Sequence, residues 1–90
     1  MSGAAHDAMA RVRVVFFASL REDVGCSELE VHATDLETLM AALEHRLSAA
    51  ALEAVRAENV RVAVNHDLVD GPVALTDGDE VAFLPPVTGG

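Results

Sequence analysis

A single stretch of this chain repeats its large apolar residues at helical spacing, and that limits the folds open to it. Leucine and methionine recur through residues 36–47, so one stripe of a helix would face a core while its charged residues stay in water. Thr34 can cap the first amides and Glu37 can reach back to it, which predicts that the helix begins here. One long helix is too few for alternating strands and crossover helices, and it favours a sheet packed on a single helix.

Short β-type segments lie on both sides of that helix. Residues 12–18 (VRVVFFA) are β-branched and aromatic, with apolar residues at odd and even positions, which predicts a central strand covered on both faces. The other strands are predicted from alternation and from flanking turn residues, at 28–33, 60–65, 68–69 and 80–84. Residues 48–59 are rich in alanine and fit a short second helix or a loop equally well.

These elements predict one α+β domain of the β-grasp class, with a mixed sheet of about four to five strands wrapped over one main helix in the order ββαβββ. Ninety residues are too few for two independent cores. We expect residues 1–10 to form a flexible N-terminal tail, residues 11–84 the domain, and residues 85–90 an extended C-terminal tail.

Charge and composition argue against several classes of function. Fifteen acidic residues against six arginines, with no lysine, give a net charge of -9, which disfavours binding to a phosphate backbone. The sequence has no apolar run of the roughly 20 residues that span a membrane, and no basic-then-apolar leader. Its one cysteine, Cys26, excludes an intrachain disulfide. We therefore expect a cytoplasmic protein that binds neither nucleic acid nor membrane.

No metal site is expected from the residue types that bind metals. The four histidines fall in the tail, a strand, the helix and a turn without ligand-like spacing, at His6, His32, His45 and His66. Cys26 has no lysine or histidine beside it in sequence to activate it, and it fits a plain turn residue. The acidic run at residues 77–80 (DGDE) fits a turn better than a calcium loop.

Strand alternation predicts an outward-facing apolar surface. If Val12, Val14 and Phe16 face the helix, then Phe17 and, on the last strand, Leu84 point away from it. Leu68, just after a turn, can extend this surface. An exposed apolar patch on an acidic domain is typical of a site for a protein partner, although singly exposed hydrophobic residues would give the same pattern.

The last six residues are Pro85, Pro86, Val87, Thr88, Gly89 and Gly90, and they predict a tail that threads into another protein. The two prolines fix φ and favour extended geometry, so the segment should leave the last strand as a stiff stalk. Six extended residues reach on the order of 20 Å, at about 3.3–3.6 Å each. Gly89 and Gly90 lack Cβ atoms, so a narrow channel could close on their backbone and leave the terminal carboxylate accessible.

The reactive group predicted for such a tail is the carboxylate of Gly90. An ionised carboxylate resists nucleophiles, so it needs activation by a partner. Acyl-adenylation would create a mixed anhydride, from which a sulfur nucleophile could displace AMP and leave a thiocarboxylate.

Three parts of the sequence together resemble the MoaD family, the small sulfur-carrier subunits of molybdopterin synthase within the ubiquitin-like β-grasp superfamily. They are VRVVFFASLRE near the start, the capped helix, and the closing block LTDGDEVAFLPPVTGG, and the resemblance covers residues 12–90. A Gly-Gly end alone is shared by several carriers and modifiers, whereas the closing block is specific.

The resemblance implies a carrier that is not itself a catalyst. Gly90 would be adenylated by an E1-like enzyme of the MoeB type, which uses ATP, and would receive sulfur indirectly from a donor of the cysteine desulfurase or rhodanese type. The tail would then enter the large, MoaE-type subunit of a heterotetramer, where two such sulfurs build the molybdopterin dithiolene from cyclic pyranopterin monophosphate. No cofactor is expected on this chain.

The family's partner-facing positions fall on Phe17, Leu68 and Leu84, and Arg21 matches a position that pairs with an acidic group of the activating enzyme. Leu84 stands where an aromatic residue is common, which reduces the expected contact area. A solvated charge is the alternative for Arg21, which lies beside Glu22 and Asp23.

Three other functions are compatible with the sequence. A related carrier could serve thiazole synthesis or another thiolation pathway. A ubiquitin-like modifier would end in an isopeptide bond to a target lysine. A plain binding module would not need Gly89 and Gly90 at all.

Overall fold

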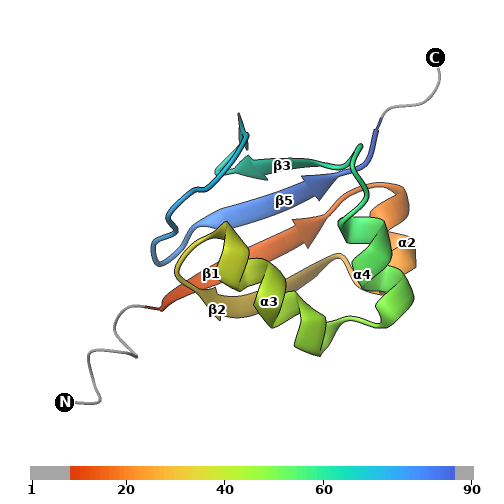
Figure 1. The fold of residues 1–90 in the computed structure, drawn as a ribbon, viewed down its shortest axis with the longest axis horizontal. Coiled ribbons are helices and arrows are strands. Elements are labelled where there is room, and N and C mark those ends of the chain that lie inside the picture. The colour runs from red at the N-terminus through yellow and green to blue at the C-terminus, as the bar shows by residue number, and fades with distance from the viewer. Residues whose placement is uncertain (1–8, 87–90) are drawn as a thin grey trace.

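The chain forms a five-stranded mixed sheet with its helices on one face (Figure 1). A computed structural model describes residues 9–86. The strands are β1 (Ala10–Phe16), β2 (Glu28–Ala33), β3 (Arg61–Val64), β4 (Asp67–Val69) and β5 (Glu80–Leu84). They lie in the order β2-β1-β5-β3-β4, with β1 and β5 parallel and each other neighbouring pair antiparallel. The predicted α+β class and β-grasp architecture are confirmed.

Three helices lie among the described residues. They are α2 (Ser19–Val24), α3 (Leu36–Arg46) and α4 (Ala49–Val55). Helix α3 is the predicted helix. For residues 48–59 the sequence fitted a helix or a loop equally well, and the structure forms helix α4 there. Helix α2 was not predicted: its six residues are too few to show a periodicity, and its apolar pair, Leu20 and Val24, stands among charged residues. Gly25, with φ of 93°, ends it in the left-handed conformation that glycine favours.

The predicted start of α3 is wrong in its details. Asp35 is the N-cap and accepts a hydrogen bond from the backbone N–H of Thr38 at 2.8 Å. The Thr38 hydroxyl oxygen in turn accepts from the Asp35 backbone N–H at 3.0 Å. The reciprocal pair is therefore Asp35 and Thr38, shifted by one residue from the expected Thr34 and Glu37, because Thr34 still belongs to the connection after β2.

The capping pair at α3 yields a test of stability. Asp35→Ala should lower the melting temperature at neutral pH by about 4–8 °C, because one helix amide loses its acceptor. Asp35→Asn keeps an oxygen acceptor without the charge and should lose much less. Thermal unfolding followed by circular dichroism measures both, and equal melting temperatures for the three chains would contradict the capping role.

The same pair makes a pH-dependent contribution of known sign. The pKa of Asp35 lies below its ordinary value, first because the Thr38 backbone amide donates to the carboxylate and next because the Thr38 hydroxyl does. A lowered folded-state pKa means that the carboxylate stabilises the fold above its unfolded-state pKa and loses this effect as the pH falls through the folded-state pKa. The gap between wild type and Asp35→Asn should close in acid.

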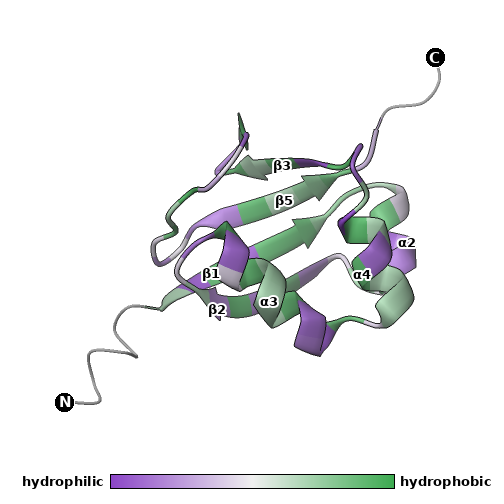
Figure 2. Cartoon of the chain, in the orientation of Figure 1, coloured by the Kyte–Doolittle hydropathy of each residue, from purple (hydrophilic) through white to green (hydrophobic). Residues whose placement is uncertain are grey.

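The core lies between α3 and the inner face of the sheet. The largest fully buried side chains are Phe16, Leu39, Leu43, Val12, Val14 and Val81. The rings of Phe16 and Phe83 stack across β1 and β5 with centroids 5.9 Å apart. Hydrophobic residues accordingly dominate the central strands (Figure 2). The alternation predicted for β1 and β5 is confirmed by these burial values.

Strand β1 begins earlier and ends earlier than the sequence pattern indicates. Ala10 already belongs to β1, where it pairs with Ala33 and is buried. At its other end the strand stops at Phe16, since Ala18 takes φ of 52° and starts α2. The predicted β1 and β2 are neighbours, as expected, but α2 separates them in sequence.

Candidate functional site

The tail leaves the sheet from one of its inner strands. β5 lies between β1 and β3, and Pro85 and Pro86 follow its last residue directly. Because β5 runs parallel to β1 and antiparallel to β3, it ends where β1 ends and β3 starts, beside α2 (Figure 1). The remaining predicted tail residues, Val87, Thr88, Gly89 and Gly90, lie outside the described part of the chain.

Strand pairing gathers apolar residues on the sheet face opposite the helices. Val15 pairs with Ala82, Ala82 with Ala63, and Ala63 with Leu68, which makes one continuous row across four strands. Alternation along β5 adds Leu84, and Phe17 continues the alternation beyond β1, its N–H donating to the Phe83 carbonyl at 3.2 Å. We refer to Val15, Phe17, Ala63, Leu68, Ala82 and Leu84 as the open-face patch.

The open-face patch combines small residues at its centre with large ones around them. Ala63 and Ala82 are 6% and 5% exposed, whereas Phe17 and Leu68 are 44% and 59% exposed. Leu84 is half-buried. The structure thus brings the predicted residues Phe17, Leu68 and Leu84 onto one face, and of these Phe17 and Leu84 lie next to the root of the tail. Their part in partner binding stays a prediction.

Arg21 lies close to this patch in the chain but on a different element. It belongs to α2, which begins two residues after Phe17. Ala18 makes the turn between them with φ of 52° and ψ of -130°, a strained conformation for a residue other than glycine, at a cost of about 1–3 kcal/mol. The Arg21 side chain is exposed, and its predicted pairing with a partner stays a prediction. Ala18 itself gave no signal in the sequence.

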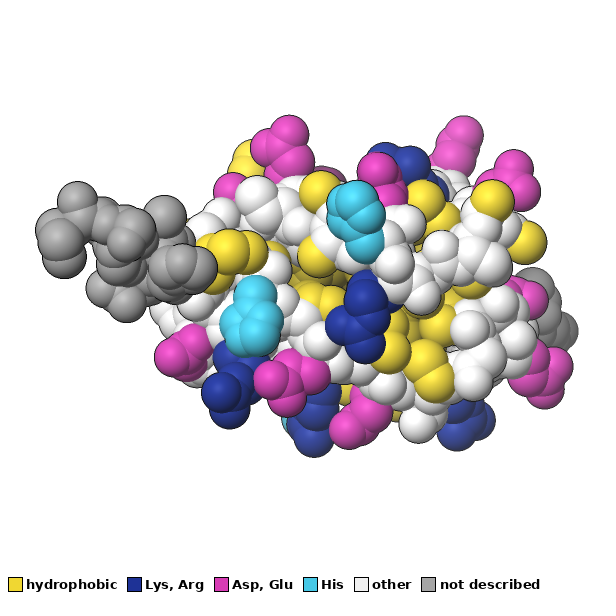
Figure 3. Space-filling model, turned by 90° about the horizontal axis from the view of Figure 1, so that it is seen from below, with side chains coloured by type: hydrophobic (Ala, Val, Ile, Leu, Met, Phe, Trp, Pro, Cys, Tyr) yellow, Lys and Arg dark blue, Asp and Glu magenta, His cyan; other side chains and the backbone are white. Residues whose placement is uncertain are grey.

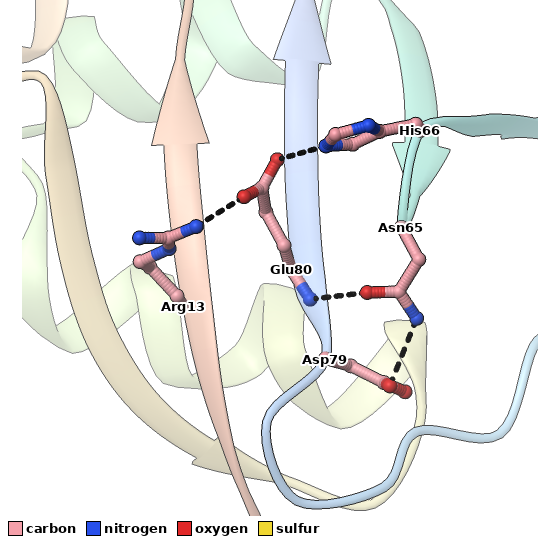
Figure 4. Close-up of polar contacts among 5 residues, drawn as sticks. All are labelled: Arg13, Asn65, His66, Asp79 and Glu80. Carbon is pink, nitrogen blue, oxygen red and sulfur yellow. Dashed lines mark hydrogen bonds and ion pairs between the residues drawn. The ribbon is translucent and has the colours of Figure 1, made fainter.

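A row of charged side chains borders the open-face patch on the side away from the tail (Figure 4). Glu80 of β5 pairs with Arg13 of β1 through one carboxylate oxygen and lies 3.4 Å from His66 Nε2 through the other. The Asn65 side chain accepts from the Glu80 backbone N–H at 3.0 Å and donates to Asp79 Oδ1 at 2.9 Å. The sequence pattern predicted the turn here, but not this network.

The acidic run serves the turn before β5. The pKa of Asp79 is lowered, first because the Asn65 amide donates to its carboxylate and next because the Thr76 backbone N–H does, at 2.8 Å. Asp77 accepts from the Arg11 backbone N–H at 2.7 Å. Asp79 therefore holds the backbone of its own turn in place, as the turn interpretation predicted, while Asp77 ties that turn to β1.

The described residues offer few other sites. No group of three or more histidine, cysteine or acidic side chains within residues 9–86 could hold a metal ion. Cys26 is half-buried and packs against the core. Acidic and basic side chains surround a group of hydrophobic side chains on the face shown in Figure 3. None of the helices in the described part of the chain is long and apolar enough to cross a membrane.

The fold and the site define a class of protein. A small β-grasp domain with an apolar open face beside the root of a Pro-Pro tail belongs to the class of ubiquitin-like domains. The pattern of the ThiS family matches residues 14–90, which is most of the chain. The chain belongs to the ThiS family.

Individual relatives sharpen this assignment. The molybdopterin synthase sulfur carrier subunit of Escherichia coli is 46% identical over 81 residues, which cover 88% of this chain and 99% of that one. Among solved structures, subunit 1 of the molybdopterin-converting factor of Helicobacter pylori, in complex with subunit 2, is 31% identical with a TM-score of 0.68, covering 89% of this chain and 99% of that one. Small archaeal modifier protein 1 of Methanosarcina acetivorans reaches a TM-score of 0.76 at 27% identity, covering 91% of this chain and 98% of that one.

Proposed function

We propose that this chain is the sulfur carrier subunit of a molybdopterin synthase. The observation that carries the proposal is the open-face patch, which keeps Phe17 exposed beside the end of β5, where the tail begins, and keeps Leu68 of β4 exposed on the same face. The 46% identity to the carrier subunit of Escherichia coli supports the same function. In this role the domain docks on a partner, and the tail delivers the reacting group.

The chemistry proceeds at the carboxylate of Gly90. A carboxylate oxygen attacks the α-phosphate of ATP on an E1-like enzyme of the MoeB type, and pyrophosphate leaves. The outer sulfur of a persulfide on a donor of the cysteine desulfurase or rhodanese type then attacks the acyl carbon, and AMP leaves, which gives an acyl disulfide. A second thiol cleaves the S–S bond of this acyl disulfide, which releases the thiocarboxylate on Gly90 and forms a disulfide between the donor cysteine and that thiol.

Sulfur transfer takes place in the large, MoaE-type subunit. Docking through the open-face patch holds the domain still while the tail enters the partner, so the acyl sulfur reaches its acceptor as if in an intramolecular reaction. Two such sulfurs convert cyclic pyranopterin monophosphate into the molybdopterin dithiolene. The acid, base and phosphate-binding groups belong to the partner in this scheme, so this chain donates sulfur without being a catalyst.

Reconstitution tests the proposal directly. The chain is incubated with the activating enzyme, ATP and a sulfur donor, and the mass of its C-terminal peptide is measured. We expect a gain equal to the exchange of one oxygen for sulfur, followed by return to the original mass when the large subunit and cyclic pyranopterin monophosphate are added. A mass that never changes would contradict the proposal.

A modifier role is the second candidate, because small archaeal modifier protein 1 shares the fold with a TM-score of 0.76. A modifier would form an isopeptide bond between Gly90 and a target lysine. Cell extracts probed for the chain separate the two functions, since a modifier produces a ladder of larger conjugates and a carrier does not. Because this chain has no lysine, such conjugates could not grow through it by lysine linkage.

A further inference from the structure

The arginine side chains of this domain differ in whether they form ion pairs or hydrogen bonds within the fold. Arg11 pairs with Glu30, Arg13 with Glu80 and Arg56 with Glu44, while Arg46 donates to the Glu30 backbone carbonyl at 3.0 Å. That accounts for four of the six arginines in the sequence. Among the contacts of residues 9–86, the side chains of Arg21 and Arg61 have no such acceptor.

Arg61 occupies a specific place on the sheet. It is the first residue of β3 and pairs in register with Leu84 of β5, so it stands on the open face at the edge of the patch. Cross-strand neighbours of this kind have Cβ atoms about 4.5–5.5 Å apart, which lets the arginine stem cover the leucine. Pro85 follows Leu84, so Arg61 lies beside the root of the tail.

No ion pair or side-chain hydrogen bond among the described residues uses the charge of Arg61. Arg13, on the same face, pairs in register with Glu30 and with Glu80, as opposite charges across strands normally do. Arg61 instead pairs with an apolar residue, and no ion pair joins it to Asp70, the acidic residue that follows β4, within the described contacts. An exposed arginine of this kind contributes little to stability.

We infer that Arg61 is a partner-contact residue, which binds a carboxylate of the large synthase subunit at the edge of the open-face patch. The inference rests on the proposed function and extends its docking surface from apolar contact to charge. A guanidinium on an aliphatic stem is well suited to the rim of an interface, because it can bind a carboxylate through two parallel hydrogen bonds. On a chain of net charge -9, a positive group next to the tail also sets the orientation in which an acidic partner surface can approach.

A pair of charge reversals tests the inference. Arg61→Glu and Arg56→Glu change the net charge equally, but Arg56 lies in the helix layer, where it pairs with Glu44 of α3. Both side chains are exposed, so both variants should fold, as circular dichroism can verify. Isothermal titration with the large subunit of the same organism should show binding weakened about tenfold or more by Arg61→Glu, and by less than about twofold by Arg56→Glu.

Two further measurements make the result specific. Arg61→Lys should retain part of the affinity, since the charge stays while the two-bond geometry is lost. The affinity of Arg61→Glu should also depend less steeply on salt than that of wild type, because one attractive pair is gone.

The outcomes separate this inference from the function on which it rests. If wild type binds the large subunit and the two reversals weaken binding equally, the effect is long-range charge and the inference about Arg61 is overturned. The inference is also overturned if Arg61→Glu raises the KM of the activating enzyme for this chain but leaves the affinity for the large subunit unchanged. If wild type neither binds the large subunit nor acquires sulfur, the proposed function fails and the inference fails with it.

Discussion

A chain carrying one extra residue after Gly90 will fold like wild type and acquire no sulfur, with a loss of loading of at least about 100-fold. The extra residue turns the Gly90 carboxylate into an amide, whose oxygen is a far weaker nucleophile toward ATP and whose carbonyl has no good leaving group. The carboxylate of the added residue lies one residue beyond the position that the activating site requires in the proposed scheme. The mass of the C-terminal peptide after incubation with the activating enzyme, ATP and a sulfur donor measures the loss.

The matched control is the same residue added before Met1. It lengthens the chain equally but leaves the carboxylate free, so loading should match wild type. Sulfur loading of the extended chain, with the added residue still attached, would mean that the reacting group lies elsewhere. Removal of that residue during the assay has to be checked in the same spectrum, because it would restore the carboxylate.

The second large effect is expected at the open-face patch. Phe17→Asp should weaken binding to the large subunit by about 100-fold or more, equivalent to about 2.7 kcal/mol. The change removes an exposed ring from the contact and places an unpaired charge in an interface from which water is excluded. Phe17 is exposed on the sheet face opposite the core, so the fold should survive the change. Titration calorimetry with the large subunit measures the affinity.

Met9 provides a close control for Phe17. It is 43% exposed against 44% for Phe17, and it precedes the start of β1, at the end of the sheet away from the tail. Met9→Asp therefore adds the same charge and removes a similarly exposed hydrophobic side chain outside the patch. Equal loss of affinity in the two variants would show that the open-face patch is not the docking surface.

The variant Arg61→Glu complements Phe17→Asp and Met9→Asp. It tests the contribution of charge to docking, whereas Phe17→Asp tests the contribution of apolar contact. Phe17 directly follows β1 and Arg61 begins β3, so the two residues lie at the same end of the sheet, near the root of the tail. If Phe17→Asp and Arg61→Glu weaken binding while Met9→Asp and Arg56→Glu do not, two independent measurements place the docking surface on the open face.

Local patterns predicted much of the fold. The helix at 36–47 and the alternation of the strands depend on periods of 3.6 and 2 residues, which can be read along the chain without knowledge of its partners in space. The outward direction of Phe17 and Leu84 followed from the same alternation. Helix α2 was missed because six residues show no periodicity, and because its formation depends on burial of the Leu20 side chain in the core.

Charge pairing could not be predicted in this way. Nothing along the sequence distinguishes Arg61 from Arg13, since each alternates with valine in a strand. Only strand order and register show that Arg13 pairs with two glutamates and Arg61 with Leu84. The capping pair at α3 was likewise misplaced by one residue, because Thr34 and Asp35 are both good caps and the end of β2 chooses between them.

By itself the sequence determined the five strands, helix α3, the inward faces of β1 and β5 and the chemistry available at the Pro-Pro and Gly-Gly end, because these depend on side-chain type and short-range spacing. Only the tertiary structure decided that residues from four strands form one apolar surface that reaches the root of the tail, and which arginines form side-chain contacts within residues 9–86. Contacts between strands far apart in the chain depend on register, and register is set by packing of the whole sheet on its helices.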